Sequence, residues 1–472
     1  MSGDADAMAQ IMGFTSFGQH RRRKPSRVEK AERDGTTARG LPQLMPGTEL
    51  VEKCTELSVN SIEKGLHGVV SLLCTETSSA AGDPLETALA EGVKKANDAA
   101  KNHLSVPSYL SVLEELEQEK HKFHEMEHGQ FLRARGSTNA FETLGRHRFL
   151  NRSAMKLVTL DHIFQWTRGV GSCPDDSFSF ADICGGPGGF CEYLLWRVSR
   201  AGSDGGSKHE RAYRGYGITL KDAANSCDWR LPSAFQHLFT RCDGEDGTGN
   251  IYSVANIHTF RDVVRARQSS GVDLVVADGG FPDARSQCNQ ESMLTKLVVA
   301  EVLAMFAVLR VGGDFVCKTF EVTTPTMMQM CWILHRCFGR FAVVKPITSR
   351  PASSERYIVA RGLRASRCLP KLVRILEDRL AQSGSMHASN VSQFPPFLPN
   401  STPMHEDVDF YKYMSAANEA IAISQVRACR RINQFRASGH KRKRCEDGTS
   451  VDPRQYYQCW QLGARPQRDS TG

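Results

Sequence analysis

The chain has 472 residues and a formal net charge of +8, from 60 lysine and arginine residues against 52 aspartate and glutamate residues. This length allows two or three domains, one of them large enough to bury a substantial core. The charge surplus is too mild to indicate a nucleic-acid partner by itself. The 15 cysteines contain no C-x-x-C pair and no secretory signal begins the chain, so we expect neither a zinc site nor a disulfide framework, and a reducing compartment.

Residues 1–105 are basic, rich in glycine, serine and alanine, and only weakly periodic. Such sequence buries little apolar surface, so we expect a largely low-complexity N-terminal extension without a catalytic unit. Its basic cluster His20–Lys24 has a counterpart, His440–Arg444, in the basic polar tail over 438–472. Clusters of this kind are typical of nuclear-import signals or nucleic-acid-binding arms, with solubilising tails as the alternative. We therefore expect a nuclear protein.

Between these ends the sequence predicts a compact domain over 106–364 and a helical extension over 365–437 that packs on it. Apolar strand patterns alternate with helical ones from about residue 133, which is typical of an α/β sheet with helices on both faces. The longest apolar stretch, 297–309, contains Glu301. It is shorter than the roughly 20 residues of a membrane helix, so we expect a buried helix and no contact with a membrane.

A glycine-rich turn follows the apolar stretch 178–183 and runs from Cys184 to Phe190. Glycines let a ligand approach the backbone, and the helix that follows presents free N–H groups. The spacing is not the G-x-G-x-x-G of a dinucleotide site. It is typical of a turn that holds S-adenosylmethionine, whose amino-acid part would contact an acidic strand end such as Asp182. A purely structural connection between strand and helix is the alternative for the turn taken alone.

Two opposite charges stand where buried strands should end, Asp278 after the run 272–277 and Lys318 after 314–317. Ligands of open α/β sheets bind beyond the carboxyl ends of the strands, so these charges and the glycine turn should meet in one crevice of a Rossmann-like sheet. A buried lysine is rarely tolerated unless paired. A structural ion pair therefore remains the alternative for this couple alone.

Two further charges belong to the expected site. Lys156 lies among apolar residues of a predicted helix, where a lysine that extends its amine to solvent is the alternative, and Glu355 precedes another apolar strand. Two amines and two carboxylates suit the removal of a proton from a hydroxyl that attacks a methyl sulfonium. We interpret Lys318 as the base and Asp278 as the group that orients its amine. Lys156 would steer the hydroxyl, and Glu355 would fix both lysines.

In chain order, Lys156, Asp278, Lys318 and Glu355 resemble the K-D-K-E tetrad of the FtsJ-like RNA ribose 2′-O-methyltransferases. Over about residues 133–436 the chain more specifically resembles the eukaryotic mRNA cap 2′-O-methyltransferases of the cap-1 type. The segments that carry the resemblance are 149–156, 181–190, 277–281, 317–320, 345–351 and 354–357. It implies methyl transfer from S-adenosylmethionine to the 2′-hydroxyl of the first transcribed nucleotide of capped mRNA.

The resemblance also implies binding residues. The implied cofactor positions are Asn151, Asp182, Cys184, Gly185, Gly186, Pro187, Gly188, Gly189, Phe190, Asn250, Ile251 and Asp278. The positions implied for the 7-methylguanosine cap and the first nucleotides are Arg135, Asn289 and Ser353, although an exposed arginine without a ligand is the alternative for Arg135. The chain departs from the family pattern at Asn250, where an acidic residue is expected, at Cys288, where glutamate is expected, and at Ser353, where asparagine is expected.

Two other functions fit the same residues less well. One is a 2′-O-methyltransferase that acts on another cap-proximal nucleotide or on ribosomal or transfer RNA. The other is a catalytically inactive cap-binding scaffold, which would have no need to keep the four charges of the tetrad. The sulfonium brings its own leaving group, so no metal is expected. The candidate protein partner of the terminal extensions is the capping or transcription machinery.

Overall fold

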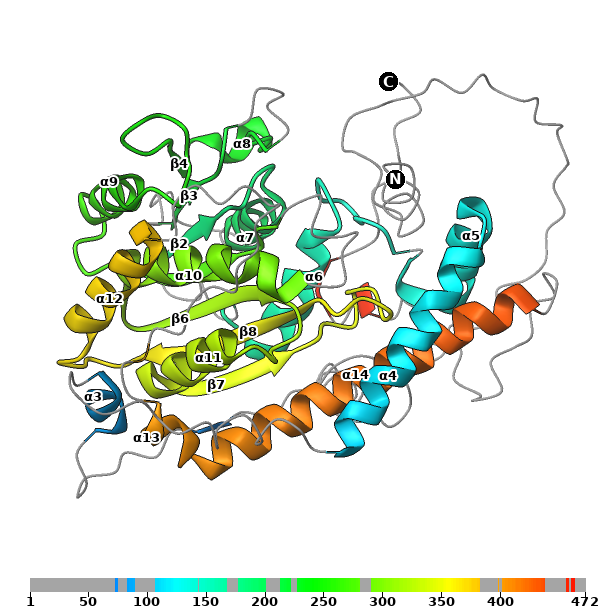
Figure 1. Cartoon of the computed structure of the whole chain (residues 1–472). Helices are drawn as coiled ribbons and strands as arrows, with labels where there is room; N and C mark the ends of the chain where they lie inside the picture. The colour runs from blue at the N-terminus through cyan, green and yellow to red at the C-terminus, as the bar shows by residue number, and fades with distance from the viewer. Residues whose placement is uncertain are drawn as a thin grey trace, which may run out of the picture.

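The structure is a computed structural model that describes part of the chain. The described residues are 73–74, 83–89, 107–142, 144–167, 177–200, 213–221, 227–280, 290–382, 398, 401–437, 456–457 and 460–462. They form an eight-stranded sheet in the order β1-β7-β8-β6-β5-β2-β3-β4 with helices on both faces (Figure 1). The predicted α/β, Rossmann-like fold is confirmed.

The strands divide into a parallel part and an antiparallel edge. Their bounds are β1 Leu73–Cys74, β2 Phe178–Ile183, β3 Tyr213–Ile218, β4 Phe239–Cys242, β5 Val272–Ala277, β6 Leu309–Thr319, β7 Phe338–Val344 and β8 Arg356–Leu363. Strands β4, β3, β2, β5 and β6 are parallel to one another, whereas the pairs β6–β8, β8–β7 and β7–β1 are antiparallel. Strands β3 and β4 are added on one side of β2, and β5 and β6 are added on its other side. The strand order therefore reverses between β2 and β5, and such a switch point opens a crevice at the carboxyl ends of the two strands.

Two helical layers cover the sheet. Helices α6 (Ser153–Phe164) and α7 (Gly189–Arg200) bury their apolar side chains in one cluster with β2 and β5. Helices α9 (Val254–Arg265), α10 (Gln290–Val308), α11 (Pro325–Cys337) and α12 (Leu369–Gln382) bury theirs in the cluster of the other face. The long apolar stretch is thus the buried helix α10 up to Val308. Among the described residues, no helix has the length and apolar character to cross a membrane.

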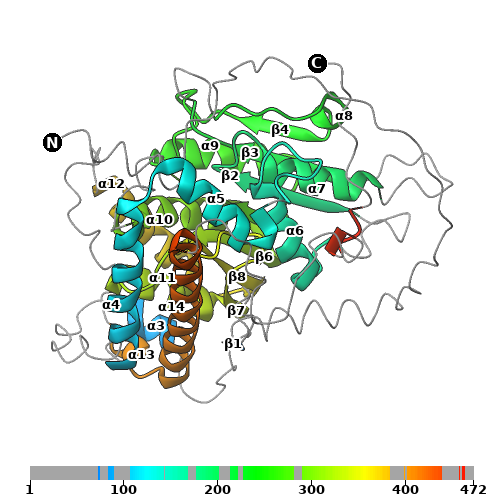
Figure 2. The same ribbon diagram turned by 90° about the vertical axis from the view of Figure 1, so that its right-hand side faces the viewer.

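A third apolar cluster joins helices that precede the sheet in the sequence to a helix that follows it. Helix α4 (Pro107–His121), the 3₁₀ turn η2 (Lys122–Glu125) and α5 (His128–Thr138) precede the sheet, and α14 (Val408–Ala437) follows it. They meet through apolar side chains such as Leu116, Phe131 and Ile432. Figure 2 shows α14 lying alongside α4 for much of its length. The C-terminal helical extension is therefore packed on the N-terminal helices as well as on the sheet.

Short pieces of both predicted extensions also pack on the fold. Strand β1 pairs with β7, and helix α3 (Pro84–Leu89) buries Leu85 and Leu89. Near the other end Trp460 and Leu462 are buried. The bounds of the extension over 1–105 and of the polar tail over 438–472 stay predictions. The sequence did not indicate these packed pieces within them, because a few isolated apolar residues leave no periodic pattern to detect. Both basic clusters lie outside the described residues.

Candidate active site

The glycine turn connects the carboxyl end of β2 to the first residue of α7, as the sequence predicts. Gly188 has φ of +111°, a conformation that side chains disfavour. A Cβ on Gly185 would lie 2.2 Å from the carboxylate carbon of Asp182. The turn therefore needs glycine both for its backbone conformation and for the close approach of the β2 carboxylate.

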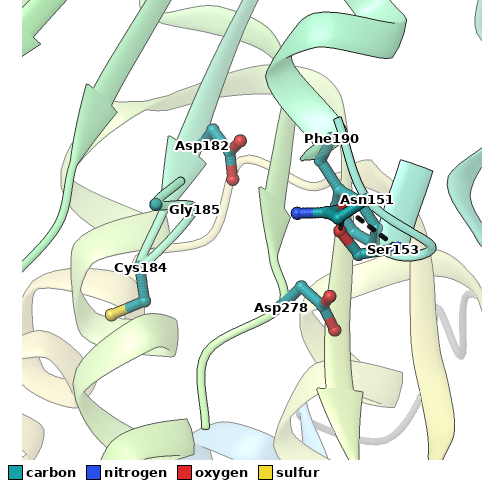
Figure 3. Close-up of a pocket in the computed structure, with 8 residues that line it drawn as sticks. Asn151, Ser153, Asp182, Cys184, Gly185, Phe190 and Asp278 are labelled. Atoms are coloured by element: carbon teal, nitrogen blue, oxygen red, sulfur yellow. Dashed lines mark hydrogen bonds between the residues drawn. The ribbon is translucent and has the colours of Figure 1, made fainter. Parts of the chain in front are cut away.

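A small pocket lies at this turn, between β2 and β5 (Figure 3). Its lining residues are Asn151, Ser153, Asp182, Cys184, Gly185, Gly186, Phe190 and Asp278. They come from the segment before α6, the end of β2, the turn, the start of α7 and the end of β5. The pocket thus occupies the switch point, where the strand order predicts a ligand site.

Asp182 has one oxygen with a partner and one without. It is fully buried, and its Oδ2 accepts a 3.1 Å hydrogen bond from the backbone N–H of Cys191. Its Oδ1 has no hydrogen-bond partner among the described residues. Burial raises the pKa of this carboxyl well above its usual range, and the charge of Asp278 adds to the effect. An unsatisfied buried acceptor is costly, so this oxygen is suited to a donor group of a ligand.

Asn151 presents the complementary group. Its Oδ1 accepts hydrogen bonds from the backbone N–H of Ser153 at 3.0 Å and from the Ser153 hydroxyl. These contacts turn the amide nitrogen toward the space bounded by Asp182 and Asp278 (Figure 3). The pocket thereby offers a donor and an acceptor a short distance apart, which suits a ligand that carries both a carboxylate and an amine.

The four predicted charges lie together at the ends of neighbouring elements. Asp278 Oδ1 is 3.2 Å from Lys318 Nζ, and Asp278 Oδ2 is 3.9 Å from Lys156 Nζ. Lys156 Nζ donates a 2.8 Å hydrogen bond to Glu355 Oε2. Lys318 also donates to the backbone carbonyl of Asp278 at 2.8 Å. The two lysines and two carboxylates thus form one connected, formally neutral network, which we call the tetrad.

Two hydroxyl groups that the sequence patterns did not indicate complete this network. Tyr357 donates a 2.8 Å hydrogen bond to Asp278 Oδ1, and Ser349 donates one of 2.7 Å to Glu355 Oε1. Burial opposes the charge of Glu355, but the ammonium groups of Lys156 and Lys318 outweigh it and lower the pKa of this carboxyl. Tyr357 stands two residues after Glu355 in β8, so the two-residue period of a strand could have indicated that both face the site.

Asp278 belongs to the tetrad and to the pocket at once. Its side chain is 13% exposed, and that of Lys318 is 10% exposed. The charges are therefore largely shielded from solvent while they border the space that a ligand would enter. Among the described residues, no three acidic, histidine or cysteine side chains are grouped in a way that could hold a metal ion.

Arg135, predicted to contact the substrate, is neither exposed nor alone. Its side chain is 12% exposed, and its Nη2 lies 3.1 Å from Glu142 Oε1. Burial and the nearby Arg350 lower its pKa to about 10. Arg152 and Arg350 also contact Glu142, at 3.4 and 3.3 Å. Three guanidinium groups around one carboxylate leave an excess of positive charge. We call Arg135, Arg152 and Arg350 the arginine cluster, and Arg152 directly follows Asn151 in the chain.

The other predicted binding positions have different surroundings. Ser353 accepts a hydrogen bond from the backbone N–H of Glu355 at 3.2 Å, so it shapes the turn that carries a tetrad residue. Asn250 accepts one from the backbone N–H of Tyr252 at 3.0 Å, and Ile251 is buried in the core. Neither of these two lines the pocket, and their cofactor role stays a prediction. Asn289 lies outside the described residues, as does Cys288.

Within the glycine turn, the predicted residues do not all face the pocket. The sulfur of Cys184 points away from the other labelled side chains (Figure 3). Pro187, Gly188 and Gly189 do not line the pocket. Gly189 nevertheless matters for its shape, because a Cβ there would lie 2.1 Å from Asn151 Oδ1. The turn contributes to the site through its backbone and through the space that its glycines leave for neighbouring side chains.

The family model for FtsJ-like methyltransferases matches residues 149–363, a range that contains the pocket and all four residues of the tetrad. Curated relatives carry the name cap-specific mRNA (nucleoside-2′-O-)-methyltransferase 1. The protein from Danio rerio is 32% identical over 334 residues, which are 66% of this chain and 38% of that protein. The protein from Dictyostelium discoideum is 31% identical over 363 residues, 74% of this chain and 46% of that protein.

The relative from Mus musculus is 35% identical over 344 residues, which cover 68% of this chain and 37% of that protein. The chain therefore spans less than half the length of these curated relatives. The range matched by the family model includes strands β2 to β8, the glycine turn and the tetrad, so the likeness extends to the residues that could carry chemistry.

Proposed function

We propose that the chain transfers a methyl group from S-adenosylmethionine to the 2′-hydroxyl of the first transcribed nucleotide of capped mRNA, since residues 149–363 match the family model for FtsJ-like methyltransferases. The names of its relatives support the cap-specific substrate. The observation that carries the proposal is the double role of Asp278, which borders the ligand pocket and contacts both lysines of the tetrad.

The pocket residues fit the amino-acid part of S-adenosylmethionine. The unpartnered Oδ1 of Asp182 suits its ammonium group, and the amide nitrogen of Asn151 suits its carboxylate (Figure 3). The backbone of the glycine turn allows close approach, and the N-terminus of α7 favours negative charge. When bound, this cofactor would supply a methyl group attached to a positively charged sulfur. The sulfur needs no further activation to act as the leaving group.

Lys318 then acts on the substrate oxygen. In its neutral form, Nζ of Lys318 accepts the proton of the ribose 2′-hydroxyl as that oxygen becomes the nucleophile. Asp278 holds the amine in place through its carboxylate, at 3.2 Å, and through its backbone carbonyl, at 2.8 Å. Asp278 is held in turn by the hydroxyl of Tyr357. The base is thus oriented by groups that are themselves hydrogen-bonded, and this limits its motion.

Lys156 and Glu355 position the hydroxyl. The lowered pKa of Glu355 keeps this carboxylate ionised near neutral pH, where it binds Lys156 at 2.8 Å. The amine of Lys156 is held beside Asp278 and can donate a hydrogen bond to the substrate oxygen. Alignment of the reacting atoms by such contacts contributes about 7 kcal/mol or more in well-ordered systems.

The arginine cluster supplies positive charge for the RNA. Three guanidinium groups share the single carboxylate of Glu142, and phosphates are the groups that arginine binds best in nucleic acids. Arg152 directly follows Asn151 in the chain. An RNA bound at the cluster would therefore reach the tetrad with its first nucleotides.

We further propose a nuclear location and a capping or transcription partner for the terminal extensions. The support is the pair of basic clusters His20–Lys24 and His440–Arg444. Loss of nuclear accumulation on neutralising both clusters would support the location. Unchanged distribution of that variant would contradict it.

Methylation of two RNAs of identical sequence, one capped and one uncapped, tests the substrate. We expect transfer to the capped RNA alone, and mass spectrometry should place the methyl group on the ribose of the first transcribed nucleotide. Equal turnover of both RNAs, or a methyl group on a ribosomal or transfer RNA only, would replace the cap assignment with the other RNA substrates. Cap binding without any transfer would indicate an inactive scaffold.

A further inference from the structure

One buried amide on α14 joins the two chain segments that carry Lys318 and Glu355. Asn418 is 1% exposed. Its Nδ2 donates a 2.8 Å hydrogen bond to the backbone carbonyl of Val322, and its Oδ1 accepts one of 2.8 Å from Nη1 of Arg356. Val322 is four residues after Lys318, and Arg356 directly follows Glu355. A single side chain therefore connects the segment that follows Lys318 to the residue that follows Glu355.

The position of Asn418 follows from where the β-ladder ends. Strands β6 and β8 pair antiparallel, with Lys318 opposite Tyr357 and Thr319 opposite Arg356 as the last pair at this end. Beyond that pair, backbone hydrogen bonds no longer fix the separation of the two segments. Asn418 makes the next connection between the two segments, because its amide binds the backbone carbonyl of Val322 and the side chain of Arg356.

Arg356 transmits this connection to the turn of Glu355. It is 1% exposed, and burial lowers its pKa. Its Nε donates a 3.1 Å hydrogen bond to the backbone carbonyl of Ser354. A buried guanidinium must be hydrogen-bonded to be tolerated. Ser354, on one side of Glu355, is thus tied through Arg356 to a fixed point on α14.

Two other buried groups hold the same turn. Gln425, one heptad after Asn418 and on the same face of α14, is 1% exposed and donates to the backbone carbonyl of Ala352 at 3.5 Å. Lys345 donates to the backbone carbonyl of Glu355 at 2.9 Å. The turn is therefore held from one side by Lys345, which directly follows β7, and from the other side by α14. Of these contacts, only that of Asn418 also reaches the segment after Lys318.

We propose that Asn418 is a positioning residue for methyl transfer, which sets the spacing between Lys318 and Glu355 from a helix outside the matched domain. This inference rests on the proposed function of the tetrad. Without the amide, the β6 and β8 segments lose their common point of attachment, and a displacement of about 1 Å in an active site can reduce the rate about a hundredfold. The helical extension is then part of the catalytic unit.

The test compares Asn418→Ala with Asn433→Ala. Asn433 is a matched control, because it lies on the same helix and its amide donates to the carbonyl and carboxylate of Glu119 on α4, at 3.0 and 2.7 Å. We expect both variants to lower the melting temperature. Only Asn418→Ala should lower kcat, by about tenfold to a hundredfold, with cofactor affinity, measured by calorimetry, unchanged. Equal kcat losses in the two variants, or none in Asn418→Ala, would overturn the inference.

A second variant protects the test against simple unfolding. Asn418→Asp keeps an acceptor for Arg356, with added charge, but sets an oxygen against the carbonyl of Val322. We expect a melting temperature close to that of the wild type together with a reduced kcat. Wild-type kcat in this variant would show that the link to Val322 has no role. The assays use whichever RNA the wild-type chain methylates, so inactivity of the wild type on every RNA defeats the proposed function and not this inference alone.

Discussion

The hydroxyl of Tyr357 donates a 2.8 Å hydrogen bond to Oδ1 of Asp278, the same oxygen that lies 3.2 Å from Nζ of Lys318. One carboxylate oxygen therefore binds both the phenol hydroxyl of Tyr357 and the amine of Lys318. Tyr357 is fully buried in β8, so its position is set by the sheet. The rigid strand thereby fixes the carboxylate, and the carboxylate orients the proposed base.

Tyr357→Phe should reduce kcat while cofactor binding persists. The variant keeps the buried ring and removes one donor to a charged acceptor, a contact that typically contributes about 1.5 to 3 kcal/mol. If that contact holds the base in its reactive position, kcat falls by about tenfold to a hundredfold. Tyr413→Phe is the matched control, since its hydroxyl accepts a hydrogen bond from the backbone N–H of Val343, on β7. Equal steady-state kcat in both variants would contradict the role of Tyr357.

Lys318→Met should abolish methylation and leave cofactor affinity largely intact, because a base acts on the substrate in the transition state. Methionine keeps the length and apolar stem of the side chain but cannot accept a proton. Single-turnover methyl transfer and calorimetry of cofactor binding check the two halves of this expectation. Lys122→Met, which removes the ion pair between an exposed lysine and Glu119, should retain full activity. Retained transfer in Lys318→Met would assign the base to another residue.

Gly185→Ala should weaken cofactor binding more than it weakens folding. Its methyl group would lie 2.2 Å from the carbon of the Asp182 carboxylate, so the carboxylate must move away from the pocket. The expected result is a dissociation constant raised at least about tenfold, which corresponds to about 1.4 kcal/mol. Gly136→Ala is the control, because a Cβ there meets nothing within 4 Å. An unchanged dissociation constant in Gly185→Ala would remove the turn from the binding site.

The sequence contains enough information to predict the tetrad, because Asp278, Lys318 and Glu355 stand at the ends of recognisable apolar runs and Lys156 lies among apolar residues of a predicted helix. Strand β5 ends at Ala277 and Asp278 follows it, so the parallel sheet alone directs this carboxylate to the crevice. The predicted strand over 314–317 lies inside the longer β6, which begins at Leu309. The first half of β6 could not be recognised from the sequence, because it contains glycines and charged residues, which have low β propensity.

The supporting contacts could not be predicted in the same way. Asn418 and Arg356 are separated by 62 residues, and no local pattern relates an amide in one helix to an arginine in a distant strand. The pairing of Arg135 with Glu142 was also not predicted, because it depends on how the chain turns between the end of α5 at Thr138 and Glu142. Periodicity reports which face of an element is buried. It does not report which polar group of another element meets that face.

Glu301 should make the folded state less stable as the pH rises. This carboxyl of α10 is 1% exposed, and burial raises its pKa from 4.5 to about 8, although a hydrogen bond from Cys317 and the charge of Lys318 oppose the shift. Between these two values the folded protein keeps the proton and the unfolded chain releases it. The contribution of Glu301 to the free energy of unfolding is therefore fully present below the unfolded pKa. It is lost as the pH rises to the folded pKa, by at most about 1.4 kcal/mol per pH unit.

Glu301→Gln removes the titration while it keeps the shape of the side chain. The free energy of unfolding in urea, measured at about pH 6 and about pH 8, should fall less between the two conditions in the variant than in the wild type. Glu117→Gln, on the exposed surface of α4, should leave the wild-type difference unchanged. Glu301 accepts a hydrogen bond from Cys317, the residue before Lys318. In its neutral form Glu301 also avoids repulsion with the negative charge of Asp278. Parallel pH profiles of stability in Glu301→Gln and the wild type would mean that the carboxyl is already ionised in the folded protein.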